Sequence, residues 1–101
     1  MIARVWHGYT KPEQADTYEE MLRNTILPGI HRVAGYKGCY VLRKGEGAEV
    51  EFITVTLWES MDAVRQFAGP NYETPVIVPE AEDLLTRHDK KSTHYQAFYS
   101  E

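Results

Sequence analysis

The chain has 101 residues, of which 43% are apolar and 26% charged, and its 11 basic and 15 acidic side chains give a formal net charge of −4. This length and composition are typical of one globular domain with a hydrophobic core, and we expect that domain to span residues 1–101. The acidic balance argues against a nucleic-acid partner or an anionic membrane surface, and no apolar run is long enough to cross a membrane. Cys39 is the single cysteine and no signal peptide is recognisable, so we expect a cytoplasmic protein without disulfides.

The first third of the chain predicts a strand followed by a helix. Residues 2–9 alternate in character, as in a strand with two different faces. One face carries Ile2, Arg4 and Trp6, and the other carries Ala3, Val5, His7 and Tyr9. Thr10 and Glu13 have the spacing of a capping box, which predicts that a helix begins here with Thr10 as its N-cap. Leu27-Pro28-Gly29-Ile30 should break or kink that helix.

The middle of the chain predicts a β-hairpin and a second helix. Residues 36–44 and 50–58 read as strands, with a turn at residues 45–47. The second strand has bulky side chains on both faces: Ile53, Val55 and Leu57 on one, and Phe52, Thr54, Thr56 and Trp58 on the other. The pattern then changes to a helical spacing, and this helix should begin after the N-cap Ser60 and end at Gly69.

The remaining residues predict an irregular segment, a short helix and a last strand. Residues 70–79 carry three prolines, residues 79–85 read as a short helix, and residues 94–99 alternate as a strand after a loop at 89–92. The order strand, helix, strand, strand, helix, strand predicts an α+β protein with a ferredoxin-like βαββαβ sandwich. In this fold class a four-stranded antiparallel sheet carries its helices on one face.

The face of the sheet away from the helices should be apolar. We expect it to carry Trp6, Ile53, Val55 and Leu57. An exposed apolar sheet face of this kind marks a surface for association. We therefore predict a homodimer in which two sheets face each other across a twofold axis.

Several segments of the chain carry a resemblance to a known family. They are Met1-Ile2-Ala3-Arg4-Val5-Trp6, Tyr18-Glu19-Glu20, Leu27-Pro28-Gly29, Gly38-Cys39-Tyr40-Val41-Leu42-Arg43, Leu57-Trp58-Glu59-Ser60 and His94-Tyr95. In these segments the chain resembles the antibiotic biosynthesis monooxygenase family, whose members are dimeric α+β barrels. The resemblance covers essentially the whole chain and implies a pocket in each subunit between the sheet and the helices. It implies three possible roles: oxidation of aromatic polyketides or quinols by O2 without flavin or metal, degradation of heme, or no assigned reaction.

The heme-degrading branch of the family can be compared residue by residue. These relatives use an Asn on the first strand, a Trp on the helix after the hairpin, and a His further on as the iron ligand. In this chain the three positions correspond to Val5, Phe67 and the region Val76-Ile77, so all three side chains are missing. Because heme iron is not held without an axial ligand, the sequence disfavours heme degradation.

The sequence carries no pattern for a cofactor or a metal. No Gly-x-Gly-x-x-Gly leads from a strand into a helix, and no two histidines stand four residues apart. An oxygenase with this sequence would therefore work without cofactor or metal, on an electron-rich phenol or hydroquinone whose anion gives an electron to O2. Such a reaction needs a base, hydrogen-bond donors for the developing charge and a dry aromatic pocket.

Three residues are candidates for catalysis: His7, His94 and Tyr72. The first and last strands should be antiparallel neighbours, so His94 could lie close to His7 and share a proton with it. In the alternative interpretation His7 belongs to the rim or dimer face, and His94 caps the start of its strand. Tyr72 could donate to a substrate oxygen or simply cover the core.

Four residues are candidates for contact with a small aromatic substrate: Val5, Thr54, Trp58 and Phe67. A Trp at a strand–helix junction is more often a core residue. Arg4 and Arg43 could hold an acidic substrate, although solvated charges on strands are the commoner interpretation. The sequence thus predicts a monooxygenase that oxidises a small aromatic or quinol substrate with O2. The alternative is a non-catalytic dimeric ligand-binding or stress-related protein on the same scaffold.

Overall fold

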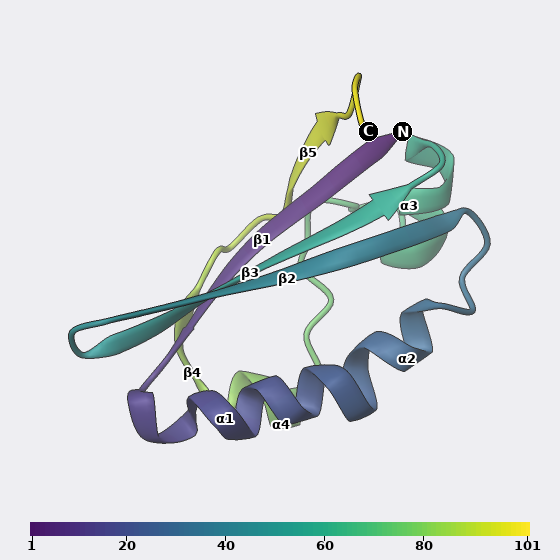
Figure 1. Cartoon of the computed structure of the whole chain (residues 1–101). Coiled ribbons are helices and arrows are strands. Elements are labelled where there is room, and N and C mark those ends of the chain that lie inside the picture. The colour runs from purple at the N-terminus through teal and green to yellow at the C-terminus, as the bar shows by residue number, and fades with distance from the viewer.

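The computed structural model describes the backbone of residues 1–101 and all side chains except that of Glu46. Its strands are β1 (Ile2–Thr10), β2 (Tyr36–Glu46), β3 (Glu49–Trp58), β4 (Leu85–His88) and β5 (Thr93–Gln96). Its helical segments are α1 (Pro12–Met21), the π-helix η1 (Leu22–Ile26), α2 (Leu27–Ile30), α3 (Met61–Ala68) and α4 (Pro79–Glu82). Figure 1 shows the helices gathered on one face of a twisted sheet. None of the described helices has the length and apolar character needed to span a membrane.

Strand β1 lies at the centre of an antiparallel sheet. The strand order is β2-β3-β1-β4, and β5 also pairs with β1. β4 pairs with the end of β1 at Gly8–Thr10, whereas β5 pairs with its start at Ile2–Val5. The prediction of an α+β ferredoxin-like fold, with helices on one face of an antiparallel sheet, is confirmed.

The edge of the sheet beside β1 differs from the prediction because the chain forms it in two pieces. β4 lies where the sequence indicates only a helix end and a loop, and β5 ends at Gln96 rather than at residue 99. Asp89 separates the two pieces. Its N–H donates to the His7 carbonyl, and its carboxylate accepts from the His7 N–H, both at 2.9 Å. His88, which the sequence places near a helix end, is therefore a residue of β4.

The register of β1 against β3 divides the sheet into a helix-covered face and an open face. Arg4 pairs with Thr56 and Trp6 pairs with Thr54, and these residues lie on the covered face. The predicted position of Trp6 on the open face is therefore wrong, because side chains alternate along a strand and Trp6 faces the same way as Thr54. The open face carries Ala3, Val5, His7, Tyr9, Tyr40, Leu42, Ile53, Val55, Leu57 and Tyr95.

The first helix differs from the prediction at both ends. It begins at Pro12 with Lys11 as its N-cap and no side-chain cap, so the predicted capping box is wrong. Thr10 is instead the buried last residue of β1, and its hydroxyl donates to the Lys11 carbonyl at 3.0 Å. The predicted kink is a π-helical turn, η1, which ends just before Pro28. Because Pro28 has no N–H, an α-helical ladder would be interrupted here in any case.

The hairpin and the helix that follows it agree more closely with the sequence. β2 continues to Glu46, so the turn is Gly47-Ala48 rather than residues 45–47, and Gly47 has a φ of 60°. Ser60 caps α3 as predicted, because its side chain accepts from the N–H of Ala63 at 3.3 Å. The junction between β3 and α3 thus follows from local sequence signals.

The core under the helices has two parts. One is centred on Tyr18 and Phe52, whose rings meet edge to face with centroids 4.8 Å apart. The other is centred on Trp58 and Val64, and Phe67 packs against it. Residues of both parts contribute to the cavity described below.

Candidate functional site

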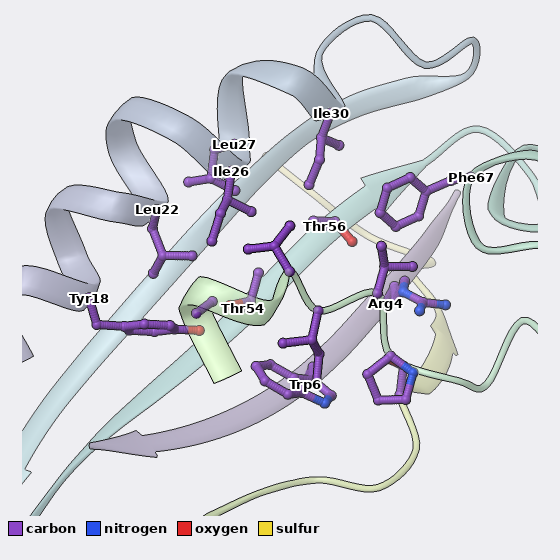
Figure 2. A pocket seen from close by; sticks show the side chains of 16 residues that line it. Arg4, Trp6, Tyr18, Leu22, Ile26, Leu27, Ile30, Thr54, Thr56 and Phe67 are labelled. Carbon is purple, nitrogen blue, oxygen red and sulfur yellow. The ribbon is translucent and has the colours of Figure 1, made fainter. Parts of the chain in front are cut away.

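A cavity of about 80 Å³ lies between the sheet and the first helix. Strands β1 and β3 form one side, the helical segment from α1 to α2 forms the opposite side, and residues 75–78 close a third (Figure 2). Most of the wall is apolar, and its polar exceptions include Arg4, Thr54, Thr56 and Ser92. For comparison, an engineered cavity of about 150 Å³ holds one benzene ring. The cavity as it stands is therefore smaller than a bound aromatic ring requires.

The π-helical turn η1 shapes the helical side of the cavity. Its residues Leu22 and Ile26, and Leu27 just after it, line the cavity (Figure 2). In an α-helix, residues five positions apart point about 140° away from each other. In η1 the N–H of Leu27 donates to the carbonyl of Leu22, and this wider turn brings both side chains to the same cavity.

Arg4 places a positive charge in the cavity wall. This residue is 5% exposed, and its guanidinium donates to the carbonyl oxygens of Tyr72 and, at 3.1 Å, Thr74. Its Cζ lies 5.7 Å from the centre of the Phe67 ring. Burial lowers the pKa of Arg4, but a guanidinium stays protonated at neutral pH. Among the described residues no carboxylate forms an ion pair with Arg4, so its charge is not neutralised.

His94 pairs with Arg4 across strands β5 and β1 and lies on the same face of the sheet. Its Nε2 is 3.0 Å from Nη1 of Arg4, and since a guanidinium only donates, Nε2 accepts this bond and carries no proton. Burial and then the charge of Arg4 lower the pKa of His94, and the carboxylate of Glu73 opposes them. The Tyr72 ring packs edge to face on the His94 ring, with centroids 5.2 Å apart. His94 is thus a neutral imidazole held beside a buried cation.

The three predicted catalytic residues are divided between the two faces of the sheet. His94 and Tyr72 lie beside Arg4 on the covered face, next to the cavity, although neither is among the described residues of its wall. His7 lies on the open face, where its Nδ1 is 2.7 Å from Oδ2 of Asp89. The expected contact between His7 and His94 is wrong, because His94 pairs with Arg4 and side chains alternate along β1.

The four predicted substrate contacts are divided in a similar way. Thr54 and Phe67 line the cavity (Figure 2). Val5 lies on the open face, away from the cavity. Trp58 is 0% exposed and stacks on Phe67 with centroids 5.0 Å apart, while its Nε1 donates to Oγ1 of Thr56 at 2.9 Å. Trp58 is therefore a core residue that supports the wall from behind.

Sequence reasoning misses the burial of Arg4. A strand arginine is usually solvated, and Arg43 has that environment: it is exposed and pairs with Asp16 and Glu19, each at 2.9 Å. The signal that could have identified Arg4 is the alternation of β1, which places it between two bulky residues of the covered face, Ile2 and Trp6.

A second cavity, of about 240 Å³, lies between the first helix and the hairpin. Its wall also contains arginines, but these have acidic partners: Arg23 and Arg43 both pair with Glu19, at 3.3 and 2.9 Å. The two cavities therefore differ in electrostatic character, and only the first holds a buried cation without a carboxylate partner among the described residues.

The residues of the first cavity do not fit a heme. Among the described wall residues only Tyr18 is of a type that ligates heme iron, and burial raises its pKa to about 12, which disfavours the phenolate. The correspondence of the relatives' Asn with Val5 also fails, because Val5 is on the open face and its neighbours Arg4 and Trp6 face the cavity. The described residues contain no group of three or more His, Cys, Asp or Glu side chains placed to hold a metal ion.

Several solved protein structures have the same fold as this chain. A search of curated protein sequences gives no significant match. One similar solved structure is a Bacillus cereus protein described as an antibiotic biosynthesis monooxygenase, with a TM-score of 0.68 and 19% identity, covering 99% of this chain and 93% of that chain. Another is the heme-degrader MhuD of Mycobacterium tuberculosis with two hemes bound in its active site, with a TM-score of 0.69 and 17% identity, covering 100% and 99%.

A third similar structure is a monooxygenase from the gene ActVA-Orf6 of Streptomyces coelicolor in complex with nanaomycin D. Its TM-score is 0.65 at 15% identity, covering 99% of this chain and 89% of that chain. At these identities the structural likeness shows a common fold alone. The family model of the antibiotic biosynthesis monooxygenases matches residues 1–71, which is more than half of the chain. The chain therefore belongs to the antibiotic biosynthesis monooxygenase family.

Proposed function

We propose that this protein is a monooxygenase that oxidises a small electron-rich phenol or hydroquinone with O2, without flavin or metal, in the cavity beside Arg4. The observation that carries the proposal is a largely apolar cavity that holds the unneutralised cation Arg4 next to the neutral imidazole of His94. A buried cation in a largely apolar wall stabilises a developing negative charge. Membership of a family that contains monooxygenases supports it.

The proposed reaction begins with loss of the phenolic proton. The phenolate gives one electron to O2, and the resulting substrate radical and superoxide combine to form a carbon–oxygen bond. Loss of water from this adduct leaves a quinone, so phenol and O2 give quinone and water. One oxygen atom of O2 enters the ring, the other leaves as water, and all four electrons come from the substrate. A hydroquinone gives a hydroxyquinone with the same balance.

In this proposal His94 accepts the proton and Arg4 stabilises the anion. Nε2 of His94 is unprotonated and lies 3.0 Å from Nη1 of Arg4. Because His94 adjoins the cavity without lining it, the proposal requires the substrate hydroxyl to displace this hydrogen bond in order to reach both groups. Tyr72 holds the His94 ring by packing against it, and Thr54 and Phe67 contact the substrate ring. His7 has no part in this chemistry, since it lies on the opposite face.

The cavity has to enlarge before an aromatic ring fits. Residues 75–77 are the part of this side that can move, because the Val78 carbonyl is held by the N–H groups of Ala81 and Glu82 at the start of α4. Among the described hydrogen bonds none is donated by the N–H of Val76 or Ile77, whereas Tyr72 and Thr74 are fixed by Arg4. Movement of this side would open the cavity without disturbing the sheet.

We also propose a homodimer formed by the open faces of two sheets. Homodimers are common in this family. The open face exposes large apolar side chains, including Tyr40, Leu42 and Tyr95, and two such faces would bury one another.

Oxygen consumption tests the proposed reaction. Purified protein incubated with a panel of hydroquinones and naphthols should consume O2 above the buffer rate and form quinone in equal amount. His94→Gln should lower the rate at least tenfold, since a general base contributes about 10²–10⁴-fold. His31→Gln, an exposed histidine beside Tyr36, is the matched control and should keep the rate. No consumption with any member of the panel, or an unchanged rate in His94→Gln, contradicts the proposal.

One observation favours a second candidate function, that of a non-catalytic ligand-binding protein. The cavity volume of about 80 Å³ is well below the roughly 300–1,000 Å³ of ordinary small-molecule sites. Under this alternative the cavity binds a small ligand and nothing reacts. Ligand binding without O2 consumption would favour it over the monooxygenase.

A further inference from the structure

We propose that Arg4 makes the first cavity selective for the ionised form of a phenol, which binds as a phenolate with Arg4 as its counterion. The proposal rests on the proposed function in taking this cavity as the binding site, but it requires no reaction with O2. In this proposal Arg4 determines whether the phenol binds in its ionised or its protonated form.

The surroundings of Arg4 stabilise its charge without neutralising it. Burying a cation is unfavourable unless hydrogen-bond acceptors or an anion compensate for the lost water. Arg4 has three acceptors: the carbonyl oxygens of Tyr72 and Thr74, and Nε2 of His94. All three are neutral, and they use three of the five N–H groups of the guanidinium. A full positive charge therefore remains at the edge of a largely apolar cavity.

Other arginines of this protein show the contrast. Four exposed arginines each pair with a carboxylate at 2.9 to 3.3 Å: Arg23, Arg43, Arg65 and Arg87. Arg4 is buried, where an acidic partner would stabilise it most, and it forms no such pair among the described residues. Glu73 is exposed and raises the pKa of His94 through its charge, but it forms no ion pair with Arg4 among the described residues. An anionic group of a ligand would supply the missing charge.

The wall of the cavity favours a phenolate over phosphate or sulfate. Phosphate or sulfate is strongly hydrated and needs many donors, whereas the wall offers one guanidinium and a few hydroxyls. A phenolate has one charged oxygen, which suits the free N–H groups of Arg4, and a flat apolar ring. Trp6 and Phe67 line the cavity on either side of Arg4 and present aromatic surface to such a ring (Figure 2).

In the alternative explanation Arg4 has only a structural role, which is to fix residues 72–74 to the sheet. A clamp of this kind would affect stability and the shape of the cavity. It would not change the ionisation of a bound ligand. The spectrum of a ligand whose two forms absorb differently therefore separates the two explanations.

The test uses 4-nitrophenol, which ionises near neutral pH and whose phenolate has its own absorption band. In the wild-type protein, bound 4-nitrophenol should ionise at least one pH unit lower than free 4-nitrophenol, a tenfold shift in its ionisation equilibrium. The uncharged methyl ether 4-nitroanisole should bind at least tenfold more weakly at pH 8. Arg4→Gln should abolish both differences, and Arg43→Gln, which removes an exposed arginine, should keep them.

Methyl-group chemical shifts identify the cavity that is occupied. Ile30 and Ile77 line the first cavity, whereas Ile53 is on the open face and Val41 lines the second cavity. Addition of 4-nitrophenol should shift the Ile30 and Ile77 signals and leave the other two unchanged. Shifts confined to Val41 would overturn the assignment of the site.

The other results that would overturn the proposal are an unshifted ionisation of bound 4-nitrophenol, no binding at millimolar ligand, or a shift that persists in Arg4→Gln. If Arg4→Gln does not fold, the titration of 4-nitrophenol bound to the wild type and the comparison with 4-nitroanisole still show whether the cavity prefers the ionised ligand. A shifted ionisation without O2 consumption keeps this inference and removes the proposed reaction. O2 consumption without a shifted ionisation removes this inference and keeps the proposed reaction.

Discussion

Arg4 has two roles that a single substitution would remove together. Its guanidinium lines the cavity and also fixes the backbone of Tyr72 and Thr74, which lie 68 and 70 residues away along the chain. The cavity is therefore assembled only when the irregular segment has docked on β1. Loss of stability and loss of ligand binding in an Arg4 variant are separate effects, and only the second reports on the charge.

The lowered pKa of His94 predicts a loss of stability on acidification. Burial, and then the charge of Arg4, hold this pKa below the usual value of 6.5. Between pH 6.5 and the lower pKa of the folded state, the unfolded chain binds more protons, so acidification favours unfolding. The stabilisation is complete above about pH 6.5 and is lost as the pH falls through the folded-state pKa. Urea unfolding should therefore show a lower midpoint at about pH 5.5 than at about pH 7.5.

The variant His94→Gln isolates this effect. Its amide oxygen can still accept from Arg4, but the side chain does not titrate. The change of the urea midpoint with pH should be smaller in His94→Gln than in the wild type, and the exposed-site variant His31→Gln should behave as the wild type does. Equal pH dependence in His94→Gln and the wild type would show that His94 is not the titrating group.

At the scale of elements, the packing of α3 on the sheet depends on Gly35. Its φ is 85°, and a Cβ at this position would lie 2.5 Å from the Cβ of Ala63 in α3. Its carbonyl also accepts from the N–H of Glu59 at 2.8 Å, which fixes the junction between β3 and α3. We predict that Gly35→Ala lowers the free energy of unfolding by about 2–4 kcal/mol, from backbone strain and overpacking. Chemical denaturation measures this loss.

Gly29 provides the matched control for this substitution. It lies in α2, has no positive φ, and no atom would come within 4 Å of an added Cβ. Gly29→Ala should raise the free energy of unfolding by about 0.5–1 kcal/mol, because alanine is the better helix former. Similar effects of the two substitutions would mean that α3 does not pack on Gly35 as described.

Sequence reasoning succeeds for elements whose determinants are local. Alternation in residues 50–58 predicts correctly which side chains face the helices, because successive side chains of a strand point to opposite faces. In residues 2–9 alternation separates the two faces correctly but does not tell which of them the helices cover, and the face predicted for Trp6 is the wrong one. The Ser60 cap and the end of α3 at Gly69 are also local signals, and the structure contains both. The fold class follows from the order of these elements, and the family resemblance agrees with it.

Other features depend on contacts between distant residues and have no local signal. β4 is a strand of only 4 residues, three of them polar, and it exists because it pairs with the end of β1. The π-helical turn that brings Leu22 and Leu27 to the cavity looks, in sequence, like ordinary amphipathic helix. The burial of Arg4 requires residues 72–74, which carry no periodicity that would dock them there.

At the scale of the whole molecule, the open face of the sheet exposes apolar side chains that no described helix covers. It exposes Tyr40 by 65%, Leu42 by 51% and Tyr95 by 57%, and these side chains come from β2 and β5 on either side of β3 and β1. A continuous apolar surface across a sheet is unusual for a monomer. The helices already cover the other face (Figure 1), so a second copy of the chain is the cover that we propose.

Substitution of Val55 tests the dimer. Val55 lies at the centre of the open face, paired with Val5 on one side and Tyr40 on the other. Val55→Arg should raise the dimer dissociation constant at least tenfold, because a charge at the centre of an apolar interface loses its water without gaining a partner. Thr17→Arg adds the same charge on the exposed outer side of α1 and should leave the dimer intact. Sedimentation at micromolar concentration measures the association of all three proteins, and circular dichroism checks that each is folded. A wild-type monomer, or an undisturbed dimer in Val55→Arg, would mean that the open face does not form the interface.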